Sequence, residues 1–155
     1  IDDRPGVSGP YIRSRVEMLN AEKKVDMICV DSLNLMRSGL KFGERKDAET
    51  DQNARDLKLV ARERNIPVWA TQQMNRRIEA RSESSRPVLS DLQEGGEKDA
   101  DLVTFVFSTF EDDKKKIKST ELITEKHRNG PTGSVDVVFN NAYTRFENAY
   151  KQNMN

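Results

Sequence analysis

The sequence predicts an α/β fold, with a mostly parallel sheet, helices on both faces of that sheet and an antiparallel strand extension at the C-terminal end. Short, continuously apolar segments recur before residue 108, and stretches of more than a dozen residues separate them. Buried parallel strands have such apolar runs and need crossovers of that length. After residue 120 the strand-like segments are joined by short turns, as in an antiparallel meander.

Two helices are expected. Ser8 can cap a helix over residues 10–23. A second helix is expected over residues 47–64, where Asn65 and Pro67 would stop it. Apolar residues at spacings of three and four form one face of each helix. They are Ile12, Val16 and Leu19 in the first helix, and Leu57, Val60 and Ala61 in the second.

Three buried strands are expected, over residues 25–31, 66–71 and 102–107. The first contains a continuous apolar run at residues 27–30, which indicates burial on both faces. Cys29, the single cysteine, lies in that run, so we expect a buried thiol in a reducing compartment. The strands of the C-terminal meander are expected at residues 121–126, 134–140 and 143–147.

The composition is that of a soluble globular domain, with 155 residues, 35% hydrophobic and 34% charged. Lys plus Arg equals Asp plus Glu at 26 each, so net charge gives no general attraction to nucleic acid. No apolar stretch is long enough to span a membrane, and we expect no signal peptide from these residues. Because the chain starts at Ile1, we expect a piece of a longer protein, with a partial domain over residues 1–148 and a polar tail over residues 149–155.

Two strand ends carry polar residues that suit a nucleotide site. Asp31 ends the first strand, where ligands of open α/β sheets bind and where a carboxylate commonly holds the magnesium of a nucleotide. Gln73 follows the second strand, and an amide there can sense a terminal phosphate. Each has a simpler explanation: Asp31 can cap the next turn, and Gln73 can be an ordinary polar loop residue.

Two cations alternate near the end of a later strand. Lys126 and Arg128 are two residues apart, so both can point toward one polyphosphate. A hairpin flanked by solvated charges is the alternative. His127 lies between them and is expected to pack rather than bind metal, because the chain has no second histidine.

A long polar stretch over residues 73–100 is expected to be a functional or a mobile loop. Its segment 90–97 contains a glycine turn whose exposed amides could bind phosphates, although the segment is mildly acidic. No phosphate-binding G-x-x-x-x-G-K-[ST] sequence occurs in the chain. The turn at residues 130–133 is no substitute, because Pro131 lacks the N–H that such a loop uses.

Together these segments resemble the motor domain of DnaB-type replicative DNA helicases, in order and over nearly the whole chain. The first matching segment is IDDRPGVS (1–8) with IRSR (12–15), and the second is VDMICVD (25–31) with LNLM (33–36), which resembles the Walker B strand. IPV (66–68) through QMNRR (73–77) resembles the glutamine sensor, and PVLSDL (87–92) and DADLV (99–103) resemble the segments around a DNA-contacting loop. KHRNGPTG (126–133) resembles the finger motif, and YTRFE (143–147) the closing strand.

The resemblance implies an incomplete RecA-like P-loop NTPase core, without its P-loop strand. It implies a homo-hexameric ring that uses ATP and Mg²⁺ and moves 5′ to 3′ on single-stranded DNA. It also implies a cytoplasmic replisome of bacterial or phage origin, with primase and helicase-loader partners. The implied residue roles are Asp31 at magnesium, Gln73 as phosphate sensor, Lys126 and Arg128 acting on the neighbouring subunit's nucleotide, Tyr143 near the nucleotide, and Gln93, Glu94 and Gly96 at the DNA backbone.

Some positions depart from the family pattern. Ser32 replaces the usual tyrosine after the Walker B aspartate, and Asn34 replaces the usual glutamine. Gln72 stands where serine is common, and Gln93 replaces an arginine in a DNA loop that is also shorter. Two alternatives stay open: another RecA-like ATPase of recombination or repair, against which the NGPTG sequence argues, and a degenerate non-catalytic module that binds DNA or partners, which the missing phosphate loop favours.

Overall fold

The computed structural model describes residues 1–39, 46–75, 78, 86–92, 95–111 and 117–149. The chain divides into two compact units. The first contains residues 1–75 and 92–100, and the second contains residues 76–91 and 101–155. Each unit has its own secondary structure and is described by itself.

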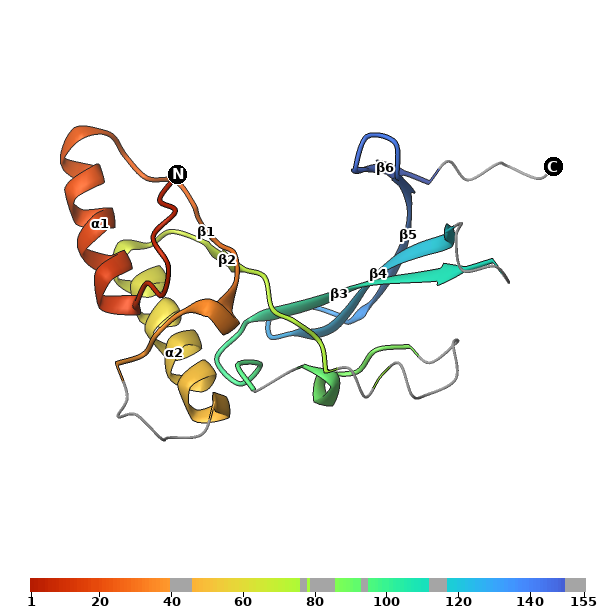
Figure 1. The fold of residues 1–155 in the computed structure, drawn as a ribbon, viewed down its shortest axis with the longest axis horizontal. Helices are drawn as coiled ribbons and strands as arrows, with labels where there is room; N and C mark the ends of the chain where they lie inside the picture. Colours follow the sequence, from red (N-terminus) through yellow and green to blue (C-terminus); the bar gives the residue numbers. More distant parts are fainter. Residues whose placement is uncertain (40–45, 76–77, 79–85, 93–94, 112–116, 150–155) are drawn as a thin grey trace. The chain divides into compact units, whose positions relative to one another are not determined.

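The first unit contains helix α1 (Gly9–Glu22), strand β1 (Ile28–Val30), a 3₁₀ turn (Leu33–Leu35), helix α2 (Lys46–Arg64) and strand β2 (Val68–Ala70), as Figure 1 shows. Both helices confirm the sequence prediction to within a residue or two. Ser8 caps α1, because its hydroxyl accepts a hydrogen bond from the Tyr11 N–H at 3.3 Å. Asn65 ends α2 in the left-handed conformation (φ 52°), which asparagine tolerates better than most residues.

The two helices pack closely against each other. Gly9 lies against Asp56 of α2, where an added Cβ would collide with the Asp56 side chain. Ion pairs Arg13–Glu63 and Arg64–Glu17 join the helices farther along. Of the predicted apolar face of α1, Val16 is buried and Ile12 is partly buried, but Leu19 is 44% exposed, so that part of the prediction is wrong. In α2, Leu57 and Val60 are buried as predicted, whereas Ala61 is only partly buried.

Strands β1 and β2 pair in parallel, with Ile28 opposite Val68, Cys29 opposite Trp69 and Val30 opposite Ala70. The core lies on one side of this pair. It contains Leu33, Met36 and Leu57, with Val7, Ile12, Val30, Ala54, Val68 and Ala70 packed around them. Since both helices contribute to this cluster, they cover the same face of the strand pair.

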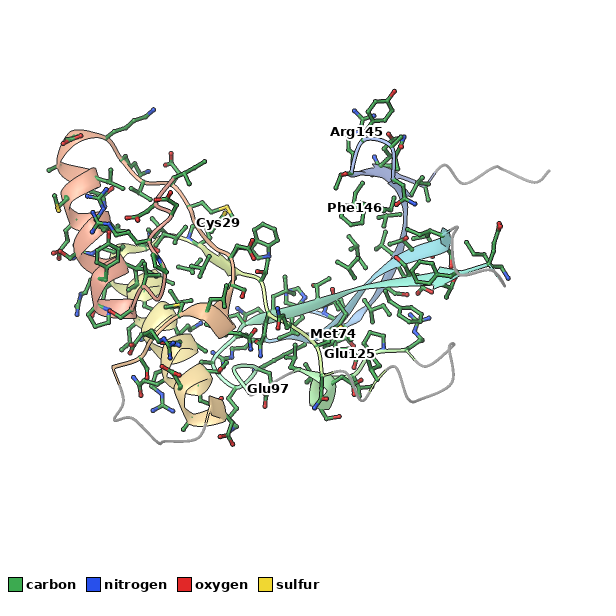
Figure 2. The ribbon with its side chains drawn as sticks, viewed as in Figure 1. Cys29, Met74, Glu97, Glu125, Arg145 and Phe146 are labelled. Atoms are coloured by element: carbon green, nitrogen blue, oxygen red, sulfur yellow. The ribbon has the colours of Figure 1, made fainter. Side chains whose placement is uncertain are left out.

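The opposite face of the strand pair is open. Trp69 is 60% exposed and Cys29 is exposed, with its side chain directed away from α2 (Figure 2). The predicted buried thiol, the predicted burial of β1 on both faces and the predicted helices on both faces are therefore wrong for the described residues. An apolar run shows that a strand can be buried, but it does not supply the element that covers it.

The second unit is an antiparallel sheet of four strands in the described residues: β3 (Leu102–Phe110), β4 (Ile117–His127), β5 (Gly133–Asn140) and β6 (Arg145–Asn148). Their order is β3-β4-β5-β6 (Figure 1). The predicted C-terminal meander is confirmed. The prediction that β3 belongs to the parallel sheet is wrong, because this strand pairs antiparallel to β4 from Leu102↔His127 to Phe110↔Ile117.

Few side chains of the second unit are fully buried. Phe105 and Ile123 are opposite each other in β3 and β4, and each is 3% exposed. The rings of Phe139 and Phe146 are 4.8 Å apart between centroids, and join β5 to β6. The hydroxyls of Ser108 and Thr120 are hydrogen-bonded at 2.9 Å, so cross-strand polar pairs also contribute to the β3–β4 pairing.

Candidate functional site

The carboxyl ends of β1 and β2 bring together the residues expected at a nucleotide. Asp31 directly follows β1, and Thr71 directly follows β2. The Thr71 hydroxyl donates a hydrogen bond to Asp31 Oδ1 at 2.6 Å, and the Thr71 N–H donates to the Val30 carbonyl at 3.0 Å. The parallel pairing therefore places an exposed carboxylate beside a hydroxyl at one edge of the sheet.

Gln73 emerges at the same edge. Its backbone N–H donates to Asn34 Oδ1 at 3.0 Å, and its side chain is exposed. Asn34 belongs to the 3₁₀ turn that follows Asp31. Gln73 is thus anchored through its main chain, while its amide side chain is at the surface near the end of the strand pair.

Asp31 fits the role of a magnesium ligand by its chemistry. Oδ1 is engaged by Thr71, while Oδ2 has no hydrogen-bond partner within the described part of the chain. Magnesium usually takes one or two carboxylates and completes its shell with waters and substrate phosphates. No group of three or more metal-ligating side chains occurs among the described residues, so a dedicated protein cage for a metal is not seen there.

The glycine turn expected to face DNA is bound to α2 and to the end of β2. Gln72 Nε2 donates to the Gly95 carbonyl at 2.5 Å, and the Gly96 N–H donates to Asp51 Oδ1 at 2.8 Å. Gly96 is buried, so the expected exposed amide is wrong at this position. Gln93 and Glu94, the other expected DNA contacts, lie outside the described residues.

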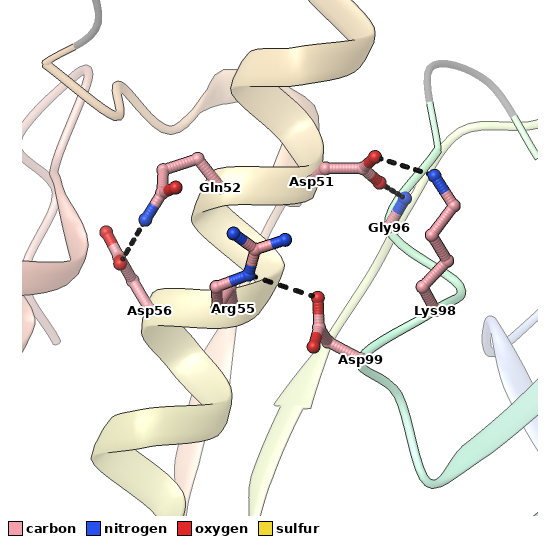
Figure 3. Close-up of polar contacts among 7 residues, drawn as sticks. All are labelled: Asp51, Gln52, Arg55, Asp56, Gly96, Lys98 and Asp99. Carbon is pink, nitrogen blue, oxygen red and sulfur yellow. Dashed lines mark hydrogen bonds and ion pairs between the residues drawn. The ribbon is translucent and has the colours of Figure 1, made fainter.

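Charged residues to which the sequence assigned no role hold this turn (Figure 3). Asp51 accepts from Lys98 Nζ at 3.0 Å through its second oxygen, and Arg55 pairs with Asp99 at 3.9 Å. All of them lie on helical or loop segments, where charge usually indicates only solvation. The separation of 45 residues between Asp51 and Gly96 leaves no local pattern from which this contact could be predicted.

The electrostatics of Asp51 follow from these contacts. Partial burial acts to raise the pKa of its carboxyl, but the Gly96 N–H, the Lys98 ammonium and Arg55 outweigh it and hold the pKa below 3.8, the ordinary value. The same pair raises the pKa of Lys98, chiefly through its hydrogen bond to Asp51. Both groups are therefore charged at neutral pH.

In the second unit, Arg128 lies one residue beyond the end of β4. Its guanidinium Nη1 is 3.0 Å from Asp101 Oδ1, and its backbone N–H donates to the Asp101 carbonyl at 2.8 Å. Lys126, within β4, is opposite Val103 and is partly buried. The side chain of Arg128 is 50% exposed, so it is not enclosed in the core of its own unit.

His127 and Tyr143 lie at turns. His127 is exposed, its Nδ1 is 3.1 Å from the Pro131 carbonyl oxygen, and its ring lies against Gly130. It therefore contacts its own hairpin turn. Tyr143 is 76% exposed in the turn between β5 and β6, where its N–H donates to the Asn140 carbonyl at 3.2 Å.

Comparison with known proteins shows the family to which this fold and these motifs belong. The family model of the DnaB-like helicase C terminal domain matches residues 1–148. The chain is 40% identical over 150 residues to the replicative DNA helicase DnaB of Leifsonia xyli, covering 94% of this chain and 32% of that protein. It is 39% identical over 157 residues to the DnaB of Haemophilus influenzae, covering 98% and 33% respectively.

Solved structures agree. One is the structure of a DnaB-like replicative helicase and its interactions with primase. It matches this chain with a TM-score of 0.83 and 34% identity, and the match covers 97% of this chain and 37% of the helicase chain. A second solved structure, of an ATPase domain, matches with a TM-score of 0.82 at 34% identity, over 94% and 52%. The chain belongs to the DnaB-like helicase C-terminal domain family. It spans about a third of the length of the replicative helicases named above.

The described helices do not include one that is both long enough and apolar enough to cross a membrane.

Proposed function

We propose that this chain forms part of a homo-hexameric, ATP-driven DNA helicase that unwinds duplex DNA at a replication fork and moves 5′ to 3′ on single-stranded DNA. Membership of the DnaB-like family supports this, as do relatives named replicative DNA helicases. The observation that carries the proposal is the Thr71–Asp31 hydrogen bond, which fixes an exposed carboxylate at the carboxyl end of two parallel strands. Ligands of open α/β sheets bind at that end.

In this proposal Asp31 is the carboxylate that holds magnesium, and Thr71 orients it through Oδ1. Bound Mg²⁺–ATP supplies the phosphoryl group and the charge neutralisation that its transfer to water requires. Gln73 faces the terminal phosphate with its exposed amide, while Asn34 fixes its backbone. The chain has no G-x-x-x-x-G-K-[ST] sequence, so this proposal assigns the binding of the β- and γ-phosphates to residues outside these 155.

Lys126 and Arg128 act on the nucleotide of a neighbouring subunit, and Tyr143 lies near the nucleotide. A guanidinium aimed at developing phosphate charge accelerates hydrolysis strongly, as arginine fingers do. The half-exposed side chain of Arg128 supports this role, because it can reach a group outside its own unit. Its ion pair with Asp101 is a resting contact that the phosphate replaces.

The DNA-facing residues are Gln93, Glu94 and Gly96. The Gly96 amide is already used by Asp51, so Gly96 contributes through the shape of the turn rather than by donating its N–H. A primase and a helicase loader are the proposed protein partners. One structural relative was studied with primase, which supports the first of these. The proposed location is the cytoplasm of a bacterium or of a phage-infected cell.

The test uses the protein encoded by the complete reading frame. With ATP and Mg²⁺ it should unwind a fork with a 5′ tail, and Asp31→Ala should remove both unwinding and ATP hydrolysis. Asp26→Ala is the matched control, because that carboxylate is 82% exposed and pairs only with Lys24 among the contacts described. Strand exchange without unwinding would instead favour a recombination ATPase. The 155-residue chain alone should not hydrolyse ATP, and turnover that depends on Asp31 would refute this.

A further inference from the structure

Asp51 binds two donors from the same turn. Its Oδ1 accepts the Gly96 N–H at 2.8 Å, and its Oδ2 accepts Lys98 Nζ at 3.0 Å (Figure 3). Both bonds involve an ionised group, and such bonds are roughly twice as strong as neutral ones. One side chain of α2 thus fixes both the main chain and a side chain of residues 95–98.

The turn fits tightly where Asp51 holds it. Gly95 and Gly96 have φ values of 83° and 92°, which residues with a Cβ rarely adopt. A Cβ on Gly95 would be 2.6 Å from Asp51 Oδ1, and one on Gly96 would be 3.0 Å from Leu33 Cδ2. The main chain of the turn can therefore approach α2 and the 3₁₀ turn this closely only because both residues are glycines.

The turn is also joined to the end of β2. The side chain of Gln72 donates to the Gly95 carbonyl, which belongs to the same peptide group as the Gly96 N–H that binds Asp51. Gln72 lies between Thr71, which contacts Asp31, and Gln73. The one peptide group between Gly95 and Gly96 is thus held from two sides, by the end of β2 through its carbonyl and by α2 through its N–H.

We propose that Asp51 is a positioning residue, which holds the Gly95–Lys98 turn on α2 in the shape that single-stranded DNA requires. This inference rests on the proposed function, because it assigns the support of a turn that is itself proposed to face DNA. In this inference Lys98 supports the turn rather than contacting DNA, since Asp51 binds its ammonium at 3.0 Å. The hydrogen bond from the Gly96 N–H to Asp51 is the contact that holds the turn, and the Lys98 ion pair adds to it.

The experiment compares four variants of the complete protein with wild type. Asp51→Ala removes both bonds, Asp51→Asn keeps an acceptor for the Gly96 N–H, and Lys98→Met removes the ion pair while the Gly96 bond remains. Gln52→Ala is the control, because this neighbour in α2 bonds to Asp56 and not to the turn. Two readouts are taken: hydrogen exchange of the peptide containing Gly96, and the rate of ATP hydrolysis with and without single-stranded DNA.

Asp51→Ala should speed exchange at Gly96 by about tenfold or more and lower the DNA-stimulated rate by about tenfold, in line with the loss of a charged hydrogen bond. The rate without DNA should stay unchanged. Asp51→Asn and Lys98→Met should keep most of the stimulation, and Gln52→Ala all of it. A purely structural role would lower both rates together.

Wild-type stimulation in Asp51→Ala would overturn the inference, whether or not exchange changes. So would equal losses in the presence and absence of DNA. If Asp51→Ala does not fold, Gly96→Ala is tested in its place, because it displaces the turn and leaves Asp51 unchanged. Unchanged stimulation by DNA in Gly96→Ala would overturn the inference. If the wild-type protein neither binds nor responds to single-stranded DNA, the proposed function fails, and this result is independent of the variants.

Discussion

Arg128 is bound twice by Asp101, once through its backbone N–H at 2.8 Å and once through its guanidinium at 3.0 Å. Asp101 directly precedes β3 and Arg128 directly follows β4, so antiparallel pairing of the two strands brings them together. The two side chains are each 50% exposed, and such an ion pair contributes about 1 kcal/mol or less. The guanidinium can therefore leave Asp101 for a phosphate at little cost.

In the assembled protein, Arg128→Ala should lower kcat for ATP hydrolysis about a thousandfold. This is the smallest effect expected when an arginine finger is lost. The melting temperature should change little, because the lost ion pair is half exposed. Steady-state ATPase assays with a parallel thermal melt check this. Arg145→Ala is the control, since Arg145 pairs with Glu147 in its own strand and should leave kcat intact.

Thr71→Val should lower ATP hydrolysis by about tenfold and raise the magnesium concentration needed for half-maximal rate. The change removes the hydroxyl that orients Asp31, at a cost of about one hydrogen bond. Thr71→Ser restores the hydroxyl and should recover most of the rate. Identical magnesium titrations for Thr71→Val and wild type would contradict this role of Thr71.

The Asp51 carboxylate should make the protein more sensitive to acid. Its pKa in the folded protein lies below 3.8, and so its stabilising contribution is complete above that value. The contribution is lost as the pH falls through the folded pKa. Denaturation of wild type and Asp51→Asn from about pH 5 to about pH 2 should show a shallower decline for the variant. Parallel declines would mean that another carboxylate dominates.

Gly9→Ala should destabilise the fold by about 1–3 kcal/mol, the usual cost of overpacking. The added methyl group would collide with Asp56 where α1 meets α2, and its nearest neighbour there is the Asp56 Cβ, which cannot swing away. Gly133→Ala provides the comparison, because no atom lies within 4 Å of the place its methyl group would take and its φ is not positive. Chemical denaturation of both variants should separate them clearly.

The helices and their ends could be predicted because their signals are local. Ser8, Asn65 and the apolar spacing within α2 act over a few residues, and the structure agrees with each. The pairing of β3 could not be predicted in the same way. An apolar segment at residues 102–107 suits a parallel or an antiparallel strand, and only its register with β4 decides between them.

The candidate site shows the same difference between local signals, which allow prediction, and long-range contacts, which do not. Asp31 and Gln73 could be placed at one edge of the sheet, because parallel strands expose their carboxyl ends together. The hydrogen bonds by which Asp51 holds Gly96 and Asp101 holds Arg128 could not be predicted, since each joins residues at least 27 positions apart. The sequence predicts that Gly96 offers its amide to a ligand, and the partner of that amide on α2 has no signal in the sequence.

Trp69 is the single tryptophan of the chain, and it lies on the open side of β1 and β2 next to Cys29. Its fluorescence therefore reports on one surface without background from another indole. When water surrounds the ring, emission is shifted to the red, and any element that covers this side will shift it to the blue. The chain thus contains its own optical probe for any element that covers this side of the strand pair.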